Sequence, residues 1–252
     1  MPTRIVFAGR RLAHGTAGML FAALGCTPLQ AQLKPDWLAV CQSETEGTPA
    51  RIAACTRAIE EPGADETTRI EGLLQRGVLH EGGGEWEAAI RDYTAVITLD
   101  GTNAVAHFNR GNVHDQLGQT DLAIADYTQA IKLDPTDPDF FNNRGQVYDS
   151  RGEHDLAIAD YTEAIRLDGS NARPFYNRGL SYANKGDYQR AIGEFDAAIK
   201  LAPDDTDLYV ARGAANEELG NQVAARADYS KALEIEPDNE DALEGLSRLG
   251  GR

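Results

Sequence analysis

The side chains best suited to catalysis or metal binding are few in this chain of 252 residues, which has five histidines and three cysteines. The sequence lacks a G-x-S-x-G nucleophile turn, an H-E-x-x-H zinc motif, a P-loop and a dinucleotide-binding fingerprint. No cysteine or dense group of carboxylates accompanies the histidines, as a metal site would require. The sequence therefore predicts no catalytic residue, no metal and no cofactor.

Two cysteines have the spacing of a disulfide in a helical hairpin. A turn centred near Thr48, where a hydroxyl cap and a proline favour a helix start, places Cys41 and Cys55 seven residues away on either side. In an oxidising compartment we expect them to form a disulfide, closing a loop worth roughly 3 kcal/mol. The alternative is a pair of buried thiols.

The third cysteine lies in an N-terminal segment that has the features of a secretory signal. Residues 1–31 carry three arginines and no acid, and the apolar stretch 17–24 is followed by a plausible cleavage point after Ala31. We therefore expect an exported, periplasmic protein. An alternative is cleavage before Cys26 and its lipidation, as in bacterial lipoproteins, although the flanking residues depart from that pattern.

The charge balance excludes several partners. The chain has 40 acidic and 24 basic residues, a formal net charge of −16. Nucleic acid is not expected to bind, because phosphate recognition needs a clustered basic surface. No apolar run is long enough to predict a membrane-spanning helix. Cleavage after Ala31 would remove three bases and no acid, which leaves 21 bases against 40 acids and a charge of −19.

A period of 34 residues governs the rest of the sequence. Each of five copies contains an Arg-Gly pair, a second glycine seven residues later, an alanine and an aromatic residue. The Arg-Gly pairs begin at Arg76, Arg110, Arg144, Arg178 and Arg212. Apolar residues at three- and four-residue steps predict two helices per copy, and the second glycine predicts the turn between them. One hairpin cannot bury its apolar face alone, so neighbouring copies must stack.

The pattern resembles the bacterial variant of the tetratricopeptide repeat family, most clearly at AIADYTQAIKLDP, residues 123–135. The resemblance implies an all-α fold, a right-handed α-solenoid of five 34-residue helix-turn-helix repeats with N- and C-terminal capping helices. The expected domains are a signal peptide at 1–31, a divergent hairpin cap at 32–69, five repeats within 70–239, and a capping helix and tail at 240–252. The repeats run 70–103, 104–137, 138–171, 172–205 and 206–239.

Two recurring features are expected to be structural. The arginine of each Arg-Gly pair is accompanied by an acid sixteen residues later, which predicts an ion pair between the two helices of each repeat. His80 and His114 occupy a position where later copies have tyrosine, so we expect them to pack inside the repeats.

The resemblance also implies a binding groove lined by the first helix of each repeat. One position of the three central repeats is asparagine, as in the exposed asparagine ladder with which some family members hold the backbone of an extended peptide. The alternative is that this asparagine is only family consensus. Groove positions contain many acids against Arg173, which favours a neutral or basic partner. The residues predicted to line the groove are Asn109, Asn143, Asn177, Asn112, Phe108, Tyr176, Asp115 and Asp149.

The sequence therefore predicts a non-catalytic protein-interaction scaffold of the bacterial cell envelope. Its expected partner is an extended peptide segment of another protein, neutral or basic. A self-associating structural envelope protein is the alternative.

Overall fold

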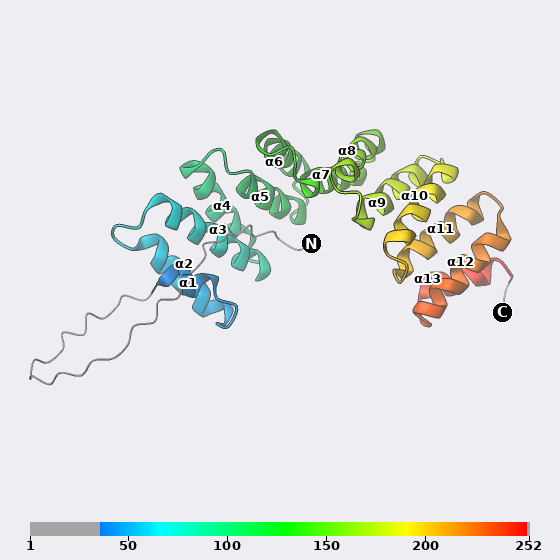
Figure 1. The fold of residues 1–252 in the computed structure, drawn as a ribbon, viewed down its shortest axis with the longest axis horizontal. Helices are drawn as coiled ribbons and strands as arrows, with labels where there is room; N and C mark the ends of the chain where they lie inside the picture. Colours follow the sequence, from blue (N-terminus) through cyan, green and yellow to red (C-terminus); the bar gives the residue numbers. More distant parts are fainter. Residues whose placement is uncertain (1–35, 251–252) are drawn as a thin grey trace, which may run out of the picture. The chain divides into compact units, whose positions relative to one another are not determined.

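The computed structural model describes residues 36–250, which form thirteen α-helices and no β-strand (Figure 1). The all-α solenoid predicted from the repeats is confirmed. The signal peptide, the cleavage after Ala31 and the lipidation of Cys26 concern residues outside this range. No helix within it is long and apolar enough to cross a membrane. The chain divides into two compact units between residues 101 and 102.

The first unit contains a short helical hairpin followed by a longer one. Its helices are α1 (Trp37–Gln42), α2 (Thr48–Glu60), α3 (Glu66–Gly82) and α4 (Trp86–Leu99). Helix α3 packs against the other three. The predicted helix start near Thr48 is correct, with a proline in the first turn, but the N-cap is Gly47. Thr48 already belongs to the helix, so its hydroxyl makes no cap hydrogen bond.

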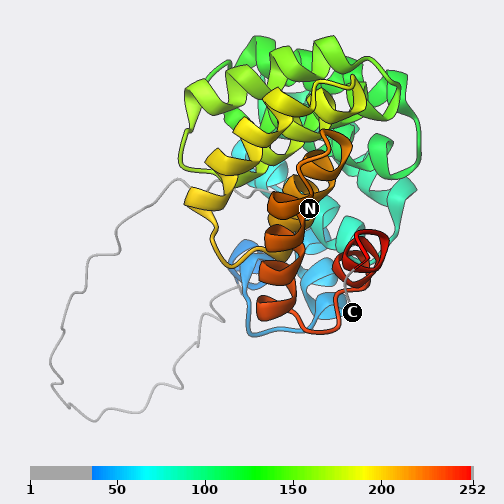
Figure 2. The ribbon, with the colours of Figure 1, turned by 90° about the vertical axis from the view of Figure 1, so that its right-hand side faces the viewer.

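The second unit contains nine helices. They are α5 (Ala104–Gln116), α6 (Thr120–Leu133), α7 (Pro138–Ser150), α8 (His154–Leu167), α9 (Ala172–Asn184), α10 (Tyr188–Leu201), α11 (Thr206–Glu218), α12 (Gln222–Ile235) and α13 (Glu240–Arg248). The odd-numbered helices, which we call the first helices, contact one another in series from α5 to α13 (Figures 1 and 2). They begin every 34 residues, and α13 continues this series at residue 240. The expected C-terminal capping helix, α13, therefore occupies the place of the first helix of a sixth repeat.

The recurring glycines explain how the two helices of a repeat pack. The glycine between them has a positive φ of 69° to 77° in every copy, a conformation that side chains with a Cβ rarely adopt. The glycine after each arginine lies against the aromatic ring of the second helix. A Cβ added at Gly145 would lie 2.8 Å from Cε1 of Tyr161. The aromatic residue is fully buried as a result, and Tyr161 is 1% exposed.

The predicted ion pair is present in all five repeats. The pairs are Arg76–Asp92, Arg110–Asp126, Arg144–Asp160, Arg178–Glu194 and Arg212–Asp228. Arg144 donates from Nε and Nη2 to both oxygens of Asp160, each at 2.8 Å. Its Nη1 also donates to Thr128 of the preceding repeat at 3.0 Å, a bond that the sequence did not predict. The arginine therefore connects neighbouring repeats as well as the two helices of its own.

Candidate functional site

The asparagines expected to form an exposed row on the first helices are buried. Asn109 is 1% exposed, Asn143 7% and Asn177 8%. Asn112 and Phe108 are buried as well, and the Phe108 ring packs 4.8 Å from that of Phe140, centroid to centroid. The predicted exposure of this row is therefore wrong, because neighbouring first helices cover the asparagine side chains.

Four of the asparagines form a chain of hydrogen bonds that crosses three first helices. Asn143 donates to Oδ1 of Asn112 at 2.9 Å, and Tyr127 donates to the same oxygen at 2.8 Å. Asn142 donates to Asn143 at 3.2 Å, and Asn177 donates to Asn142 at 3.1 Å. We call Asn112, Asn142, Asn143 and Asn177 the amide chain. It links α5, α7 and α9, and each of its buried amides is hydrogen-bonded to at least one other.

Two asparagines distinguish the amide chain from the predicted row. Asn142 belongs to it but was not predicted; the signal in the sequence is the Asn-Asn pair at 142–143, where the adjacent repeats have one asparagine. Asn109 was predicted but does not belong to it. Both polar atoms of the Asn109 side chain are buried and have no hydrogen-bond partner within the described part of the chain.

The two predicted acids of the groove have different surroundings. Asp149 is half-buried, and its carboxylate interacts with Ser181 at 2.6 Å, His154 at 2.8 Å and Tyr161 at 3.1 Å. Its oxygens are thus engaged by neighbouring helices. Asp115 is also half-buried, and burial raises the pKa of its carboxyl group. No hydrogen bond or charge contributes to that shift, so the Asp115 carboxyl group is less engaged by neighbouring side chains than that of Asp149.

Tyr176 lies at the edge of a hollow between successive first helices. The hollow has a volume of about 410 Å³ and is lined by residues of α7, α9 and the start of α11. We call it the α9 hollow, and its main lining residues are Gln146, Arg173, Tyr176, Asp205, Asp207 and Leu208. The Tyr176 ring is half-buried and packs 6.0 Å from the Phe195 ring, centroid to centroid.

More acids than bases line the α9 hollow. Burial raises the pKa of Asp207, and the nearby carboxylates of Asp205, Glu236 and Asp241 raise it further. The pKa of Tyr176 is raised by burial and then by the negative charges around it. Both shifts have the direction expected where like charges accumulate without enough bases to balance them.

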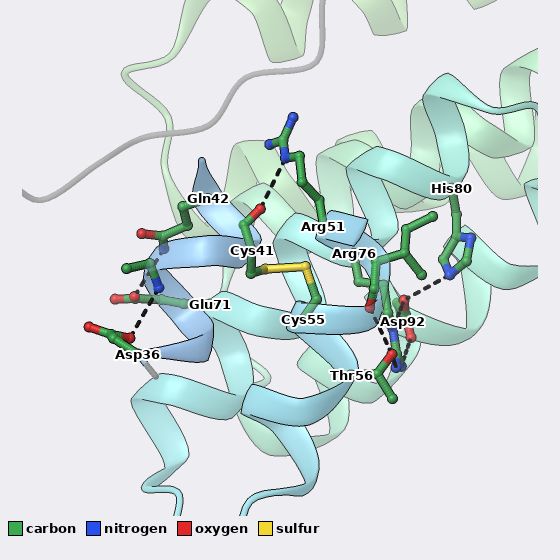
Figure 3. The surroundings of a disulfide bond; sticks show 12 residues. Asp36, Cys41, Gln42, Arg51, Cys55, Thr56, Glu71, Arg76, His80 and Asp92 are labelled. Atoms are coloured by element: carbon green, nitrogen blue, oxygen red, sulfur yellow. Dashed lines mark hydrogen bonds and ion pairs between the residues drawn. A yellow bond between two sulfur atoms is a disulfide. The ribbon is translucent and has the colours of Figure 1, made fainter. Parts of the chain in front are cut away.

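The predicted disulfide joins α1 to α2 in the first unit (Figure 3). The Cys41 and Cys55 sulfurs are 2.11 Å apart, and both residues are fully buried. Leu79 of α3 belongs to the same apolar cluster, and Arg51 donates to the carbonyl of Cys41 at 3.1 Å. The disulfide therefore holds the short helix α1 onto the rest of the unit.

His80 and His114 pack as expected, and His107 is buried too. His114 is 9% exposed, and its Nδ1 lies 2.7 Å from Oε1 of Gln119. The Nδ1 of His80 lies 2.6 Å from Glu85, and that of His107 lies 3.0 Å from Asp126. Across residues 36–250, no group of three or more His, Cys, Asp or Glu side chains is arranged to hold a metal ion.

Structural comparison connects this architecture with several solved proteins. A crystal structure of MamA is 27% identical in sequence, with a TM-score of 0.61 over 64% of this chain and 94% of that chain. YrrB, described as a TPR protein with an unusual peptide-binding site, is 24% identical, with a TM-score of 0.65 over 78% and 99%. PilF of Pseudomonas aeruginosa is 20% identical, with a TM-score of 0.66 over 73% and 84%. The last two likenesses show the fold alone.

Family models give the same assignment from the sequence. Models described as "Tetratricopeptide repeat" match residues 104–137, 126–159 and 176–240, and one described as "TPR repeat" matches 83–118 and 145–186. The curated proteins contain no match. Because the matched ranges run without a gap from 83 to 240, over helices that recur every 34 residues, the chain belongs to the tetratricopeptide repeat family.

Proposed function

We propose that this protein holds an extended, neutral or basic peptide segment of a protein partner along the first helices of its second unit. Tetratricopeptide repeat proteins are typically non-catalytic scaffolds for protein–protein interactions. The finer assignment of peptide and surface rests on the residues that remain accessible on those helices.

The observation that carries the proposal is the sign of the accessible charge on the first helices. Asp115 on α5 is half-buried, and Asp205 and Asp207 at the start of α11 are exposed. Arg173 is the base that lines the α9 hollow together with Asp205 and Asp207. Such a surface attracts basic segments and repels acidic ones. Tyr176 adds an aromatic contact, and aromatic anchors commonly supply much of the binding energy.

The amide chain has a supporting part in this proposal. Both amide groups of Asn142 and Asn143 are already hydrogen-bonded within the amide chain, so these two residues offer little to a peptide backbone. They join α5, α7 and α9, the helices that carry Asp115 and Tyr176. A surface held rigid in this way lowers the entropy lost on binding.

To test the proposal, a partner is first captured with the protein. The affinity of that partner is then measured for the unchanged protein and for its variants. Tyr176→Ala should weaken binding about tenfold or more, as loss of an aromatic anchor does. Added salt should weaken binding of the unchanged protein, because exposed charges are screened. Glu163→Gln on α8 is the control, since this exposed acid belongs to a second helix. Equal affinity of the Tyr176 variant and the unchanged protein would contradict the proposal.

We also propose that the protein works outside the cytoplasm, in the bacterial cell envelope. The support is the buried Cys41–Cys55 disulfide, because such bonds persist in oxidising compartments, together with the signal-like sequence at 1–31. Mass spectrometry of the mature protein tests this. An N-terminus at Gln32 supports cleavage and export, a lipidated Cys26 supports an anchored form, and an intact N-terminus contradicts both.

Self-association is a second candidate because of two exposed leucines. Leu122 on α6 is 51% exposed and Leu156 on α8 is 49% exposed, and they occupy the same position of successive repeats. Light scattering of the mature protein, with and without Leu122→Lys and Leu156→Lys, tests this candidate. A monomer at all concentrations would exclude it.

A further inference from the structure

We propose that the α9 hollow is a pocket for a single lysine or arginine side chain of the partner. This inference rests on the proposed peptide-binding function and names the residue type that the surface selects. The hollow lies where three consecutive first helices meet, so a peptide running across them would pass over it.

The walls of the hollow suit the two parts of a long basic side chain. The half-buried Tyr176 ring offers apolar surface to the methylene groups, while Leu208, which also lines the hollow, is only 2% exposed. Lysine and arginine bury such stems while their charged ends remain with polar groups. A cation near the Tyr176 ring would also be attracted by the aromatic face.

The charged end would meet carboxylates that lack a cation of their own. Asp205 and Asp207 line the hollow, and Glu236 and Asp241 are near enough to add to the negative charge felt by Asp207. Arg173 is exposed and has no ion pair within the described chain. Acids therefore outnumber bases, and an incoming ammonium or guanidinium group would reduce the repulsion among them.

An unpaired acceptor provides a second and independent observation. The Oε1 atom of Gln146, on α7, is buried without a hydrogen-bond partner among the described residues. Native proteins rarely leave a buried acceptor unpaired. Gln146 lines the hollow, so rotation of its amide toward a bound ammonium or guanidinium group would give the oxygen a donor.

An anion is a poorer fit, although two helices begin at the hollow. Asp205 accepts a hydrogen bond from the Asp207 amide at 3.1 Å, and Asn171 accepts one from the Arg173 amide at 3.0 Å. Their own side chains thus already bind the starts of α11 and α9. An added carboxylate would compete with these caps and lie beside two aspartates.

The experiment uses the full chain and four synthetic peptides that differ at one position. Each is an acetylated and amidated pentapeptide of glycine and alanine whose central residue is lysine, arginine, norleucine or glutamate. NMR titration of the backbone amides measures affinity and location. The lysine or arginine peptide should bind about tenfold or more tightly than the norleucine peptide, with the largest shifts at residues 146, 171–177 and 205–208. The glutamate peptide should bind most weakly.

Variants test the residues that carry the inference. Asp205→Asn with Asp207→Asn should remove the preference for lysine over norleucine, while an asparagine at 205 can still cap α11. Arg173→Gln should strengthen binding of the lysine peptide several-fold, because it removes a like charge from the lining. Glu87→Gln on α4 is the control, since this exposed acid lies in the first unit and does not line the hollow. Thermal melts confirm that each variant is folded.

Three results would overturn the pocket: equal affinity of the lysine and norleucine peptides, an unchanged lysine preference in the double variant, or no binding of any peptide at millimolar concentration. These results leave the proposed function intact if Tyr176→Ala still weakens the captured partner. Both proposals fail if the Tyr176 variant also binds that partner normally.

Discussion

The N-terminal cap hairpin and the repeats of the molecule fasten their helices by different means. In the first unit, the hairpin of α1 and α2 is closed by the buried Cys41–Cys55 disulfide. Helix α1 has only six residues, and a helix of that length is unstable in water without tertiary support. In the repeats, including the hairpin of α3 and α4 in the first unit, hairpins of full length are fastened by arginine–carboxylate pairs and by close packing of glycine against an aromatic ring. A covalent bond serves the shortest hairpin, and repeated non-covalent contacts serve the longer ones.

The comparison shows how the position of a repeat in the stack decides which contacts stabilise it. Arg144 bonds to the second helix of its own repeat and to that of the preceding repeat. An interior repeat therefore gains contacts on both sides, as in other stacked-repeat proteins. The cap hairpin has the disulfide instead, so the two kinds of fastening should respond differently to substitution.

The largest effect is expected from breaking an interior ion pair. Arg144→Leu leaves the buried Asp160 carboxylate without its bidentate partner, which should lower the free energy of unfolding by about 3–5 kcal/mol in urea titrations. Arg166→Leu is the matched control, because its pair with Glu163 is exposed and such pairs contribute about 0–1 kcal/mol. Similar losses in the two variants would show that burial does not decide the strength of these pairs.

Removal of the disulfide should have the second-largest effect on stability, and this effect should be confined to the first unit. Replacing Cys41 and Cys55 together by alanine should cost about 3 kcal/mol, since the bond closes a loop with a sequence separation of 14. Hydrogen exchange should then quicken over α1 and α2 and remain unchanged from α5 to α12. Equal quickening in both units would mean that they unfold together, which would remove the distinction drawn between them.

The amide chain should contribute less than either. Asn143→Ala removes a donor to Asn112 and an acceptor of Asn142, so stability should fall by about 1–3 kcal/mol. Asn109→Ala occupies the same repeat position but removes no hydrogen bond within the described chain, so chemical denaturation should show a much smaller loss. If the two variants lose the same stability, the hydrogen bonds of the amide chain are not what stabilises that layer.

The contrast between Asn109 and Asn143 also marks the limit of inference from sequence. The 34-residue period predicted the starts of α5, α7, α9 and α11 at residues 104, 138, 172 and 206, because each start depends on local turn and capping residues. The Arg–acid pairs and the disulfide were predictable from spacing for the same reason.

The surroundings of the asparagines were not predictable in this way. Periodicity shows which side of a helix a residue occupies, but the side chains of the next repeat decide whether that side is covered. Asn143 and Asn177 are the same residue type at the same repeat position, yet Asn143 donates to Asn112 and Asn177 donates to Asn142. The bond from Arg144 to Thr128 was missed for a related reason, because it joins residues of different repeats.

The smallest expected effect is a pH dependence that separates an uncompensated acid from a paired one. Burial raises the pKa of Asp115 above its usual 3.8, so the folded state favours the protonated form. Asp115→Asn should therefore stabilise the protein at neutral pH, and the gain should fade as the pH falls through the raised pKa and vanish below 3.8. Glu217 gives the opposite sign, because its hydrogen bond to Arg248 lowers its pKa below the usual 4.5. Glu217→Gln should destabilise the protein at neutral pH, with the loss fading as the pH falls from 4.5 through the lowered pKa. Urea denaturation at a series of pH values measures the change in the free energy of unfolding for each variant. If the two variants change stability in the same direction at neutral pH, the distinction between the two acids is contradicted.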